Sequence, residues 1–275
     1  MAAAPSSHSG SSRTKIDILI PAIEKDLRTL PHVIDAVRKY VKHPIGEILI
    51  VSPRKEKIIA LCRRKGCRFV DENTVFPLTK KDMHYSSRTW DRSGWLFQQM
   101  LKFCGDTLCS SKYYLVIDAD TVLIRPHVFL SGEKTVFYCR NWSQPEYFKT
   151  YRKLMGRKRS SSSSFVTHYM LFERKKMAEL KKTIASRHRT SWYHAILRSM
   201  NKSKQFAFSE FETYGNFIHS TYPGKLLLKP ALNRSLHTGV AKLSASRSRE
   251  LARTYRSVSF HERKAYARGS KAARG

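Results

Sequence analysis

The stretch YYLVIDADTVL, residues 113–123, runs from an apolar, β-branched and aromatic segment directly into two aspartates. The apolar part predicts a buried strand, because a central strand of a parallel sheet is covered on both faces. Carboxylates are costly to bury, so Asp118 and Asp120 are expected where the strand leaves the sheet, at the edge where open α/β sheets bind ligands. Side chains at i and i+2 of an extended chain point the same way. The pair therefore predicts a hard-oxygen site suited to Mg²⁺ or Mn²⁺ carrying a diphosphate, and the simpler alternative is a turn with two solvated aspartates.

The chain before this stretch has the alternating order of a parallel sheet. Three short apolar runs are separated by two segments with apolar residues at helical spacing. A β-α-β-α-β order implies parallel strands with right-handed crossovers, so we predict an α/β fold with a mostly parallel central sheet flanked by helices. Besides the strand before Asp118, the expected strands are 15–21, 47–51, 67–70, 135–139, 165–172 and 226–230, and the expected helices are 26–41, 55–65, 91–103, 175–200 and one with Ser209 as its N-cap.

The length of 275 residues suits one large α/β domain. We place this domain at 15–241, after a disordered Ala/Ser/Gly-rich segment at 1–14 and before a basic tail at 242–275, which is either a helix or disordered. Inside the domain, 147–164 is predicted to be a flexible basic and serine-rich loop. The sequence shows no secretory signal and no apolar run of membrane-spanning length, so we expect a cytoplasmic protein.

The charge balance is strongly basic, with 52 Lys and Arg against 21 Asp and Glu and a formal net charge of +31. Such a charge favours an anionic partner or surface, and nucleic acid, anionic lipid and nucleotide-sugar phosphates all qualify. No recognised nucleic-acid-binding motif is present, so phosphate attraction alone would give non-specific, salt-sensitive binding. The basic loop and tail could instead hold the protein on the inner face of a membrane. A further alternative is that the charge only keeps the protein soluble.

Several common signatures are absent from the sequence. It has no Walker A loop, no Gly-x-Gly-x-x-Gly after the first strand and no metalloprotease His pair. The five cysteines are odd in number and lack the Cys-x₂-Cys spacing of common zinc sites, which argues against a disulfide framework and structural zinc. Residues 20–25, IPAIEK, contain no glycine, whereas sugar nucleotidyltransferases usually carry a Gly-rich signature after the first strand.

Over roughly residues 15–240, the order of elements resembles the GT-A fold of nucleotide-sugar glycosyltransferases. The segments FVTHYML at 165–171 and SEFETYGN at 209–216 resemble blocks of a largely uncharacterised, mostly bacterial family of glycosyltransferases with this fold. The basic serine loop and the basic tail lie outside the resemblance. The resemblance implies an enzyme that moves a sugar from a nucleotide-sugar donor to a hydroxyl of a glycan, lipid-linked or envelope-type acceptor.

The resemblance also implies roles for residues around the donor. Asp118 and Asp120 would hold the divalent metal and the donor diphosphate, where a metal offsets the charge of the leaving group. Pro21 and Ala22, at the end of the first strand, would lie beside the base or ribose. Gln98 and Lys102 could reach the donor phosphates from their helix, with a solvated polar face as the alternative.

Late in the chain the resemblance implies a further metal ligand and a catalytic carboxylate. GT-A enzymes often add a histidine to the metal site, and His237 is the candidate, with His168 and His219 as competitors. We place His168 near the acceptor instead. Inverting members use a carboxylate to deprotonate the acceptor hydroxyl, and Glu210 and Glu212 are the candidates. Glu212 also occupies the capping-box position, which makes Glu210 the better base, while a retaining enzyme would need no such base.

Overall fold

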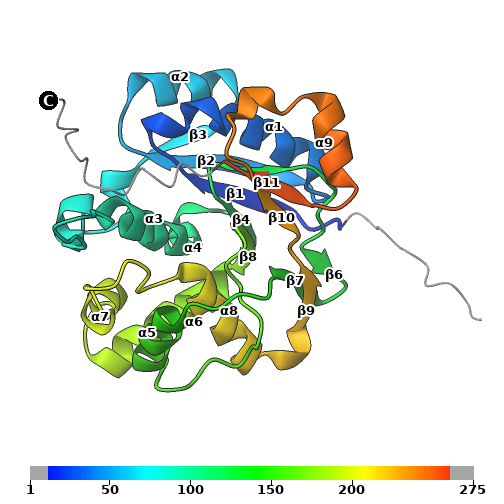
Figure 1. Ribbon diagram of the computed structural model, residues 1–275. Coiled ribbons are helices and arrows are strands. Elements are labelled where there is room, and N and C mark those ends of the chain that lie inside the picture. Colours follow the sequence, from blue (N-terminus) through cyan, green and yellow to red (C-terminus); the bar gives the residue numbers. More distant parts are fainter. Residues whose placement is uncertain (1–11, 261–275) are drawn as a thin grey trace, which may run out of the picture.

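The computed structural model describes residues 12–260, and its centre is a five-stranded sheet (Figure 1). The strand order is β3-β2-β1-β4-β8, with the first four strands parallel and β8 antiparallel to β4. Their bounds are β1 Ile16–Pro21, β2 Ile45–Ser52, β3 Arg68–Asp71, β4 Tyr113–Ile117 and β8 Tyr169–Glu173. The predicted α/β class with a mostly parallel sheet is therefore confirmed.

Both faces of this sheet are covered, which explains why its strands are apolar on both sides. Alternate residues feed two cores: Leu19 and Val116 pack into one, and Ile18 and Leu115 pack into the other. Helices α1 (Leu30–Tyr40) and α2 (Glu56–Arg64) cover the face drawn at the top of Figure 1. Helices α3 (Ser93–Phe103) and α4 (Gly105–Leu108) lie on the other side, above a helical lobe.

The helical lobe consists of α5 to α8 and packs below the sheet in Figure 1. The bounds of its helices are α5 Pro145–Met155, α6 Arg174–His188, α7 Trp192–Ser199 and α8 Glu210–Thr221. The prediction of a flexible loop at 147–164 is wrong for its first part, because Tyr147, Tyr151 and Leu154 form the buried stripe of α5. The largely helical segment expected at 175–200 is divided into two helices, and Arg189 adopts a left-handed conformation with φ of 49° where α6 ends.

Two small sheets complete the molecule. One has the order β6-β7-β9 and the other β10-β11-β5. Their strands are β5 Thr121–Leu123, β6 Leu130–Ser131, β7 Lys134–Cys139, β9 Leu226–Pro230, β10 Asn233–Ser235 and β11 Ser257–Ser259. A last helix, α9 (Ala245–Ala252), packs beside α1 in Figure 1.

The fold therefore extends past the domain end predicted at residue 241. Strand β11 pairs with β10 on one side and with β5 on the other, so this part of the expected tail belongs to the folded domain. The remainder of that tail, 261–275, and most of the segment predicted as disordered at 1–14 lie outside the described residues. Between residues 12 and 260, no helix is both long and apolar enough to cross a membrane.

Candidate active site

The carboxyl ends of the parallel strands meet at one edge of the sheet, and Asp118 lies there. In the β1–β4 pairing Leu19 is opposite Val116, and continuing this register by two residues sets Pro21 opposite Asp118. Because β8 runs the other way, its first residue, Tyr169, lies beside Ile117. The residue before it, His168, accepts a hydrogen bond from the Asp118 amide at its carbonyl, at 2.9 Å.

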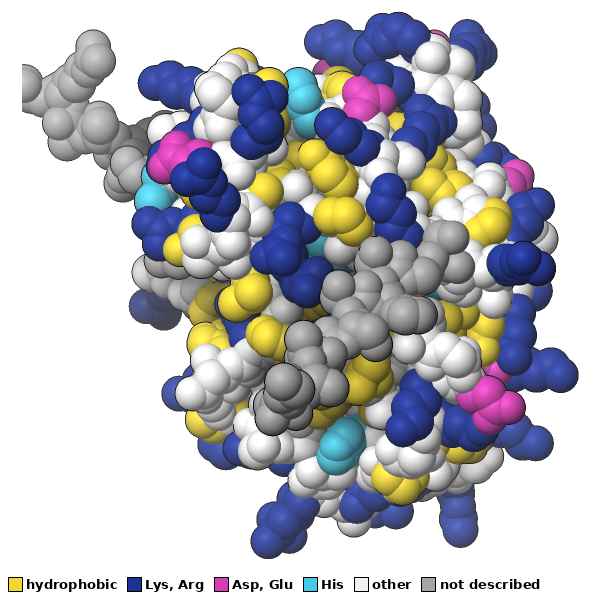
Figure 2. All heavy atoms as spheres, turned by 90° about the vertical axis from the view of Figure 1, so that its right-hand side faces the viewer, with side chains coloured by type: hydrophobic (Ala, Val, Ile, Leu, Met, Phe, Trp, Pro, Cys, Tyr) yellow, Lys and Arg dark blue, Asp and Glu magenta, His cyan; other side chains and the backbone are white. Residues whose placement is uncertain are grey.

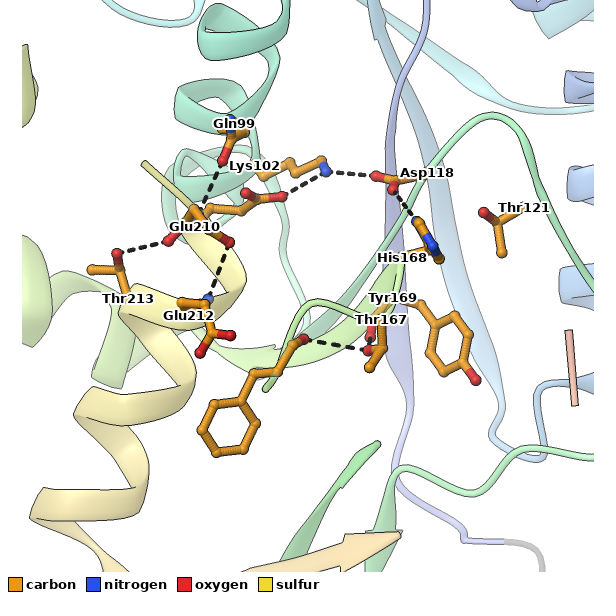
Figure 3. A network of polar contacts seen from close by, with 12 residues as sticks. Gln99, Lys102, Asp118, Thr121, Thr167, His168, Tyr169, Glu210, Glu212 and Thr213 are labelled. Atoms are coloured by element: carbon orange, nitrogen blue, oxygen red, sulfur yellow. Dashed lines mark hydrogen bonds and ion pairs between the residues drawn. The ribbon is translucent and has the colours of Figure 1, made fainter. Parts of the chain in front are cut away.

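His168 has a φ of 72°, a left-handed conformation that is uncommon for a residue with a side chain. This turn directly precedes β8, which begins at Tyr169, so the strand expected from residue 165 is shorter than predicted. It also directs the imidazole back to the site, where Nδ1 lies 3.2 Å from Oδ2 of Asp118 (Figure 3). His168 is thus a neighbour of the first aspartate, whereas its expected place near the acceptor stays a prediction.

The other oxygen of Asp118 accepts from Lys102, whose Nζ lies 2.5 Å from Oδ1. Burial alone would raise the pKa of Asp118, but the charge of Lys102 and the hydrogen bond from His168 outweigh it and hold that pKa well below its usual range. Both carboxylate oxygens are therefore engaged, and Asp118 is ionised throughout the neutral range.

Lys102 joins Asp118 to Glu210, which lies 108 positions later in the chain than Lys102. Its Nζ is 2.6 Å from Oε1 of Glu210 and 4.6 Å from the centre of the Phe211 ring. Lys102 and Glu210 are both buried. Burial would lower the pKa of Lys102, but the two carboxylates outweigh it and raise that pKa. Burial, followed by the charge of Asp118, raises the pKa of Glu210, and Lys102 opposes that rise.

Helices α3 and α8 set the geometry of this contact, as Figure 3 shows. Lys102 is in the last turn of α3, and Gln99, almost one turn earlier on the same face, accepts from the backbone amide of Glu210 at 3.2 Å. Glu210 opens α8, where Ser209 caps the helix by accepting from the Glu212 amide at 3.2 Å. The predicted N-cap is therefore correct.

The Glu212 side chain faces a different group of residues. It accepts from the Ser164 hydroxyl and, at 3.1 Å, from the Asn216 amide. Burial raises the pKa of Glu212 to about 6. Asn216 in turn accepts from the amides of Ser160 and Ser161, so the serine run predicted to be flexible is attached to α8.

A third carboxylate shares the sheet edge with the two predicted aspartates, and it was not among the predicted site residues. Asp26 accepts from the Ile23 amide at 2.9 Å in the turn after β1. Burial raises its pKa to about 6, and the negative charges of Asp120 and Asp118 contribute to that rise, which places the three carboxylates within electrostatic range. The sequence feature that could have identified Asp26 is its position shortly after the first strand, at the same edge of the sheet as Asp118.

His237 lies on the far side of Asp120, two strands away. Ser235, the last residue of β10, pairs with Ser259 of β11, which in turn pairs with Thr121. The Asp120 carbonyl accepts from the amide after β11 at 3.0 Å. His237 follows β10 by two residues and is exposed, so its backbone is about 10 Å from that of Asp120 at the usual strand spacing.

These residues have the donor chemistry of a divalent metal site. Carboxylate oxygens are the ligands that Mg²⁺ and Mn²⁺ prefer, and Asp26, Asp118 and Asp120 bring three carboxyl groups to one edge. In residues 12–260, however, no three Asp, Glu, His or Cys side chains are close enough together to hold one ion.

The remaining predicted residues fall partly inside this site. Pro21 and Ala22 are buried at the end of β1, where the Ala22 amide donates to Val51 at 3.0 Å. Gln98 is half-buried on α3, and it is its neighbour Gln99 that contacts Glu210. His219 lies near the other end of α8 and contacts Ser160, about 13 Å along the helix from Glu210.

The described geometry is that of an α/β sheet with a charged network at the edge where open α/β sheets bind ligands. Its fold is GT-A-like, as the sequence predicted. The solved structure of the WbbM bifunctional glycosyltransferase resembles the chain with a TM-score of 0.50 and 11% identity, over 90% of this chain and 46% of that one. The chain thus spans about half the length of that protein.

Two further solved structures are similar at lower scores. The galactosyltransferase LgtC, in complex with donor and acceptor sugar analogues, has a TM-score of 0.46 and 12% identity over 89% of this chain and 87% of that one. Mouse xyloside xylosyltransferase 1 has a TM-score of 0.45 and 12% identity over 90% and 97%. No curated protein sequence matches the chain.

The family is shown by the sequence itself. Residues 13–242 match the model of the family of unknown function DUF6492, and the chain belongs to that family.

Proposed function

We propose that the protein is a glycosyltransferase that uses a nucleotide-sugar donor. The observation that supports this most is the position of Asp118, at the carboxyl end of β4 and in contact with both Lys102 and His168. This edge of an open α/β sheet is where ligands bind, and the GT-A-like fold agrees with donor binding there. The likeness to WbbM, whose structure is described as a glycosyltransferase, supports the same class.

In this proposal the donor diphosphate lies against the sheet edge, with Pro21 and Ala22 beside the nucleoside. Asp118 and Asp120, with His237 as a further ligand, would hold Mn²⁺ or Mg²⁺. When bound, the metal offsets the negative charge that the leaving diphosphate acquires. Asp26 adds negative charge that favours a cation at this edge. Gln98 contacts the donor phosphates from α3.

In this proposal Lys102 and Glu210 lie next to the donor, where Lys102 supplies a positive charge and Glu210 acts as a base. Lys102 keeps a positive charge beside the donor site even though it is buried, because two carboxylates stabilise it. Burial raises the pKa of Glu210, which suits a base that takes the proton of the acceptor hydroxyl. Glu212 is a weaker candidate, because Ser164 and Asn216 already occupy its carboxylate. His168 would face the acceptor.

A thermal-shift screen of UDP, GDP and TDP with and without Mn²⁺ tests the proposal. We expect one nucleotide to raise the melting temperature in a metal-dependent way, as a ligand that binds only the folded state must. Asp118→Asn and Asp120→Ala should remove that shift. The matched control is Asp35→Asn on α1, an exposed aspartate paired with Lys65, which should keep it. No nucleotide response in the wild type, or an unchanged one in Asp120→Ala, would contradict the proposal.

The basic charge of residues 147–209 favours an acceptor at an anionic surface. Residues 147–209 contain sixteen Lys and Arg and two Glu. In the helical lobe the ends of α5 and α6 meet, since His188 lies 3.1 Å from the Leu154 carbonyl and Arg187 covers Gly156. Lys and Arg also outnumber acidic side chains on the face shown in Figure 2.

We therefore propose that the protein works at the inner face of an anionic membrane, on a glycan or lipid-linked acceptor, with general nucleic-acid binding as the alternative. Co-sedimentation with liposomes that contain phosphatidylserine, compared with neutral liposomes, tests this. Competition by double-stranded DNA is the second arm of the experiment: stronger retention on DNA than on liposomes at physiological salt would favour the alternative.

A further inference from the structure

A stack of one guanidinium group and two aromatic rings lies at the start of α3, on the side of the molecule away from β9 (Figure 1). The Arg92 guanidinium lies between two rings, 4.0 Å from the centre of Trp95 and 4.4 Å from that of Phe206. The two rings meet edge to face, with centres 6.3 Å apart and an angle of 87°. Arg92 is 3% exposed, whereas Phe206 is 40% exposed. Phe206 therefore covers Arg92 and offers the rest of its surface to solvent.

Two loops hold this ring in place. Tyr85 donates its hydroxyl hydrogen to the Lys204 carbonyl and accepts from the Ala207 amide at 3.1 Å. Lys202 donates to the Met83 carbonyl at 3.3 Å. The loop before α8 is thus attached to the loop before α3 on both sides of Phe206. An exposed aromatic ring that is fixed from below and at both flanks loses little entropy when a ligand stacks on it.

The stack is connected to the proposed active site through α3 and α8. Trp95, Gln99 and Lys102 are spaced i, i+4, i+7, so they share one face of α3, and Trp95 is about 10 Å along the helix from Lys102. Gln99 contacts the amide of Glu210, and Phe206 precedes Glu210 by four residues. Trp95, which contacts Phe206, is thus about 10 Å along α3 from the buried Lys102–Glu210 pair, so a ligand on Phe206 would lie near that pair.

The charge around Phe206 is positive on balance. Arg92 lies against the ring, and the loop that carries Phe206 contributes Lys202 and Lys204 with no acidic residue between Leu180 and Ser209. The loop before α3, residues 79–92, contributes four Lys and Arg and two Asp. The flat, weakly polar face of a sugar ring packs well on an aromatic ring, and a carboxylate on that sugar would be attracted by these cations.

We propose that Phe206, supported by Arg92 and Trp95, binds an acidic saccharide unit of the acceptor at a distance from the reacting hydroxyl. This inference rests on the proposed glycosyltransferase function for its purpose, but the binding itself is independent of the donor. It assigns to residues 200–206 a part in acceptor selection.

The proposal is tested by isothermal titration calorimetry of the full-length protein with two trisaccharides. Trigalacturonate is the acidic probe and maltotriose is the neutral one. Wild type should bind trigalacturonate more tightly than maltotriose. Phe206→Ala should weaken trigalacturonate binding roughly threefold to tenfold, the loss expected for one aromatic contact, and Phe206→Trp should retain it. Leu228→Ala is the matched control, because Leu228 is 37% exposed on β9 and should leave binding unchanged.

Three results would overturn the inference: no binding of trigalacturonate by the wild type, equal binding of both probes, or equal binding by Phe206→Ala and wild type. The last result would mean that charge alone attracts the saccharide. Phe206→Ala should also keep the nucleotide-dependent thermal shift, which shows that the variant is folded. Absence of a nucleotide-dependent thermal shift in the wild type and in every variant would instead count against the glycosyltransferase proposal.

Discussion

Replacing Lys102 by methionine should destabilise the protein and make its stability depend on pH in a new way. The variant keeps the length of the side chain but leaves Asp118 and Glu210 facing each other without the cation that lies 2.5 Å and 2.6 Å from them. Removing one partner from a buried ion pair costs about 3–5 kcal/mol. For a protein of this size that corresponds to a fall in melting temperature on the order of 10 °C at pH 8.

The sign of the pH dependence follows from Glu210. Its pKa is already raised by burial and by Asp118, and the Lys102→Met variant loses the charge that opposes this rise. A carboxyl group whose pKa is higher in the folded state destabilises that state as pH rises above the unfolded value of about 4.3. Lys102→Met should therefore be much closer to wild type at pH 5 than at pH 8.

Thermal unfolding followed by circular dichroism at these two pH values is the assay. Lys112→Met is the matched control, because Lys112 is 62% exposed and lies 3.7 Å from Glu173, so its loss should cost less than about 1 kcal/mol. The double variant Lys102→Met with Glu210→Gln removes the facing charge and should recover most of the stability. The reasoning would be refuted if Lys102→Met had the melting temperature of the wild type at pH 8, or if its melting temperature were lowered by the same amount at pH 5 and pH 8.

Three more substitutions test other parts of the structure. The pKa of Glu212 is about 6 in the folded protein against an ordinary value of 4.5, so the free energy of unfolding should fall by about 2 kcal/mol as pH rises through that interval. Glu212→Gln should abolish this pH dependence in urea unfolding curves. Asp17 accepts five hydrogen bonds, including those from the Ser110 and Ser111 amides at 2.8 Å, and together they outweigh burial and lower its pKa. Asp17→Asn should cost about 1–3 kcal/mol at pH 7 and less at pH 3, because a lowered pKa stabilises the fold above about 3.9 and that stability is lost as pH falls; equal costs at both would contradict this. In Gly105→Ala the new Cβ would lie 2.2 Å from the buried Tyr114 ring, so calorimetry should show a loss of about 1–3 kcal/mol, whereas Gly224→Ala, which meets nothing within 4 Å, should show none.

The central sheet could be predicted because its signals are local. The apolar run before Asp118 marks a strand without reference to any other part of the chain. The alternation of strands and helices before it then implies the parallel order. In the same way, the Ser209 cap needs only the next three residues.

The contacts of the site could not be predicted, because they join distant segments. Lys102 and Glu210 meet only after α3 and α8 have packed together, so the sequence could not show that the lysine predicted to reach the donor phosphates is bound to two carboxylates. His168 reaches Asp118 through a left-handed turn that no residue preference indicates. By contrast, helix α5 was missed although the apolar spacing of Tyr147, Tyr151 and Leu154 was visible, because its many charges suggested a loop.

The place of β11 has a consequence for synthesis of the protein on the ribosome. Strand β5 begins directly after Asp120, yet its partner β11 follows it in the chain by more than 130 residues. Until β11 has been made, the backbone around Asp120 lacks its hydrogen bond from the residue after β11, although β1, β4 and Lys102 are already available. The proposed donor site is therefore completed only once residues 257–260 have been made, and a nascent chain arrested before residue 257 should carry an unpaired strand edge beside Asp120.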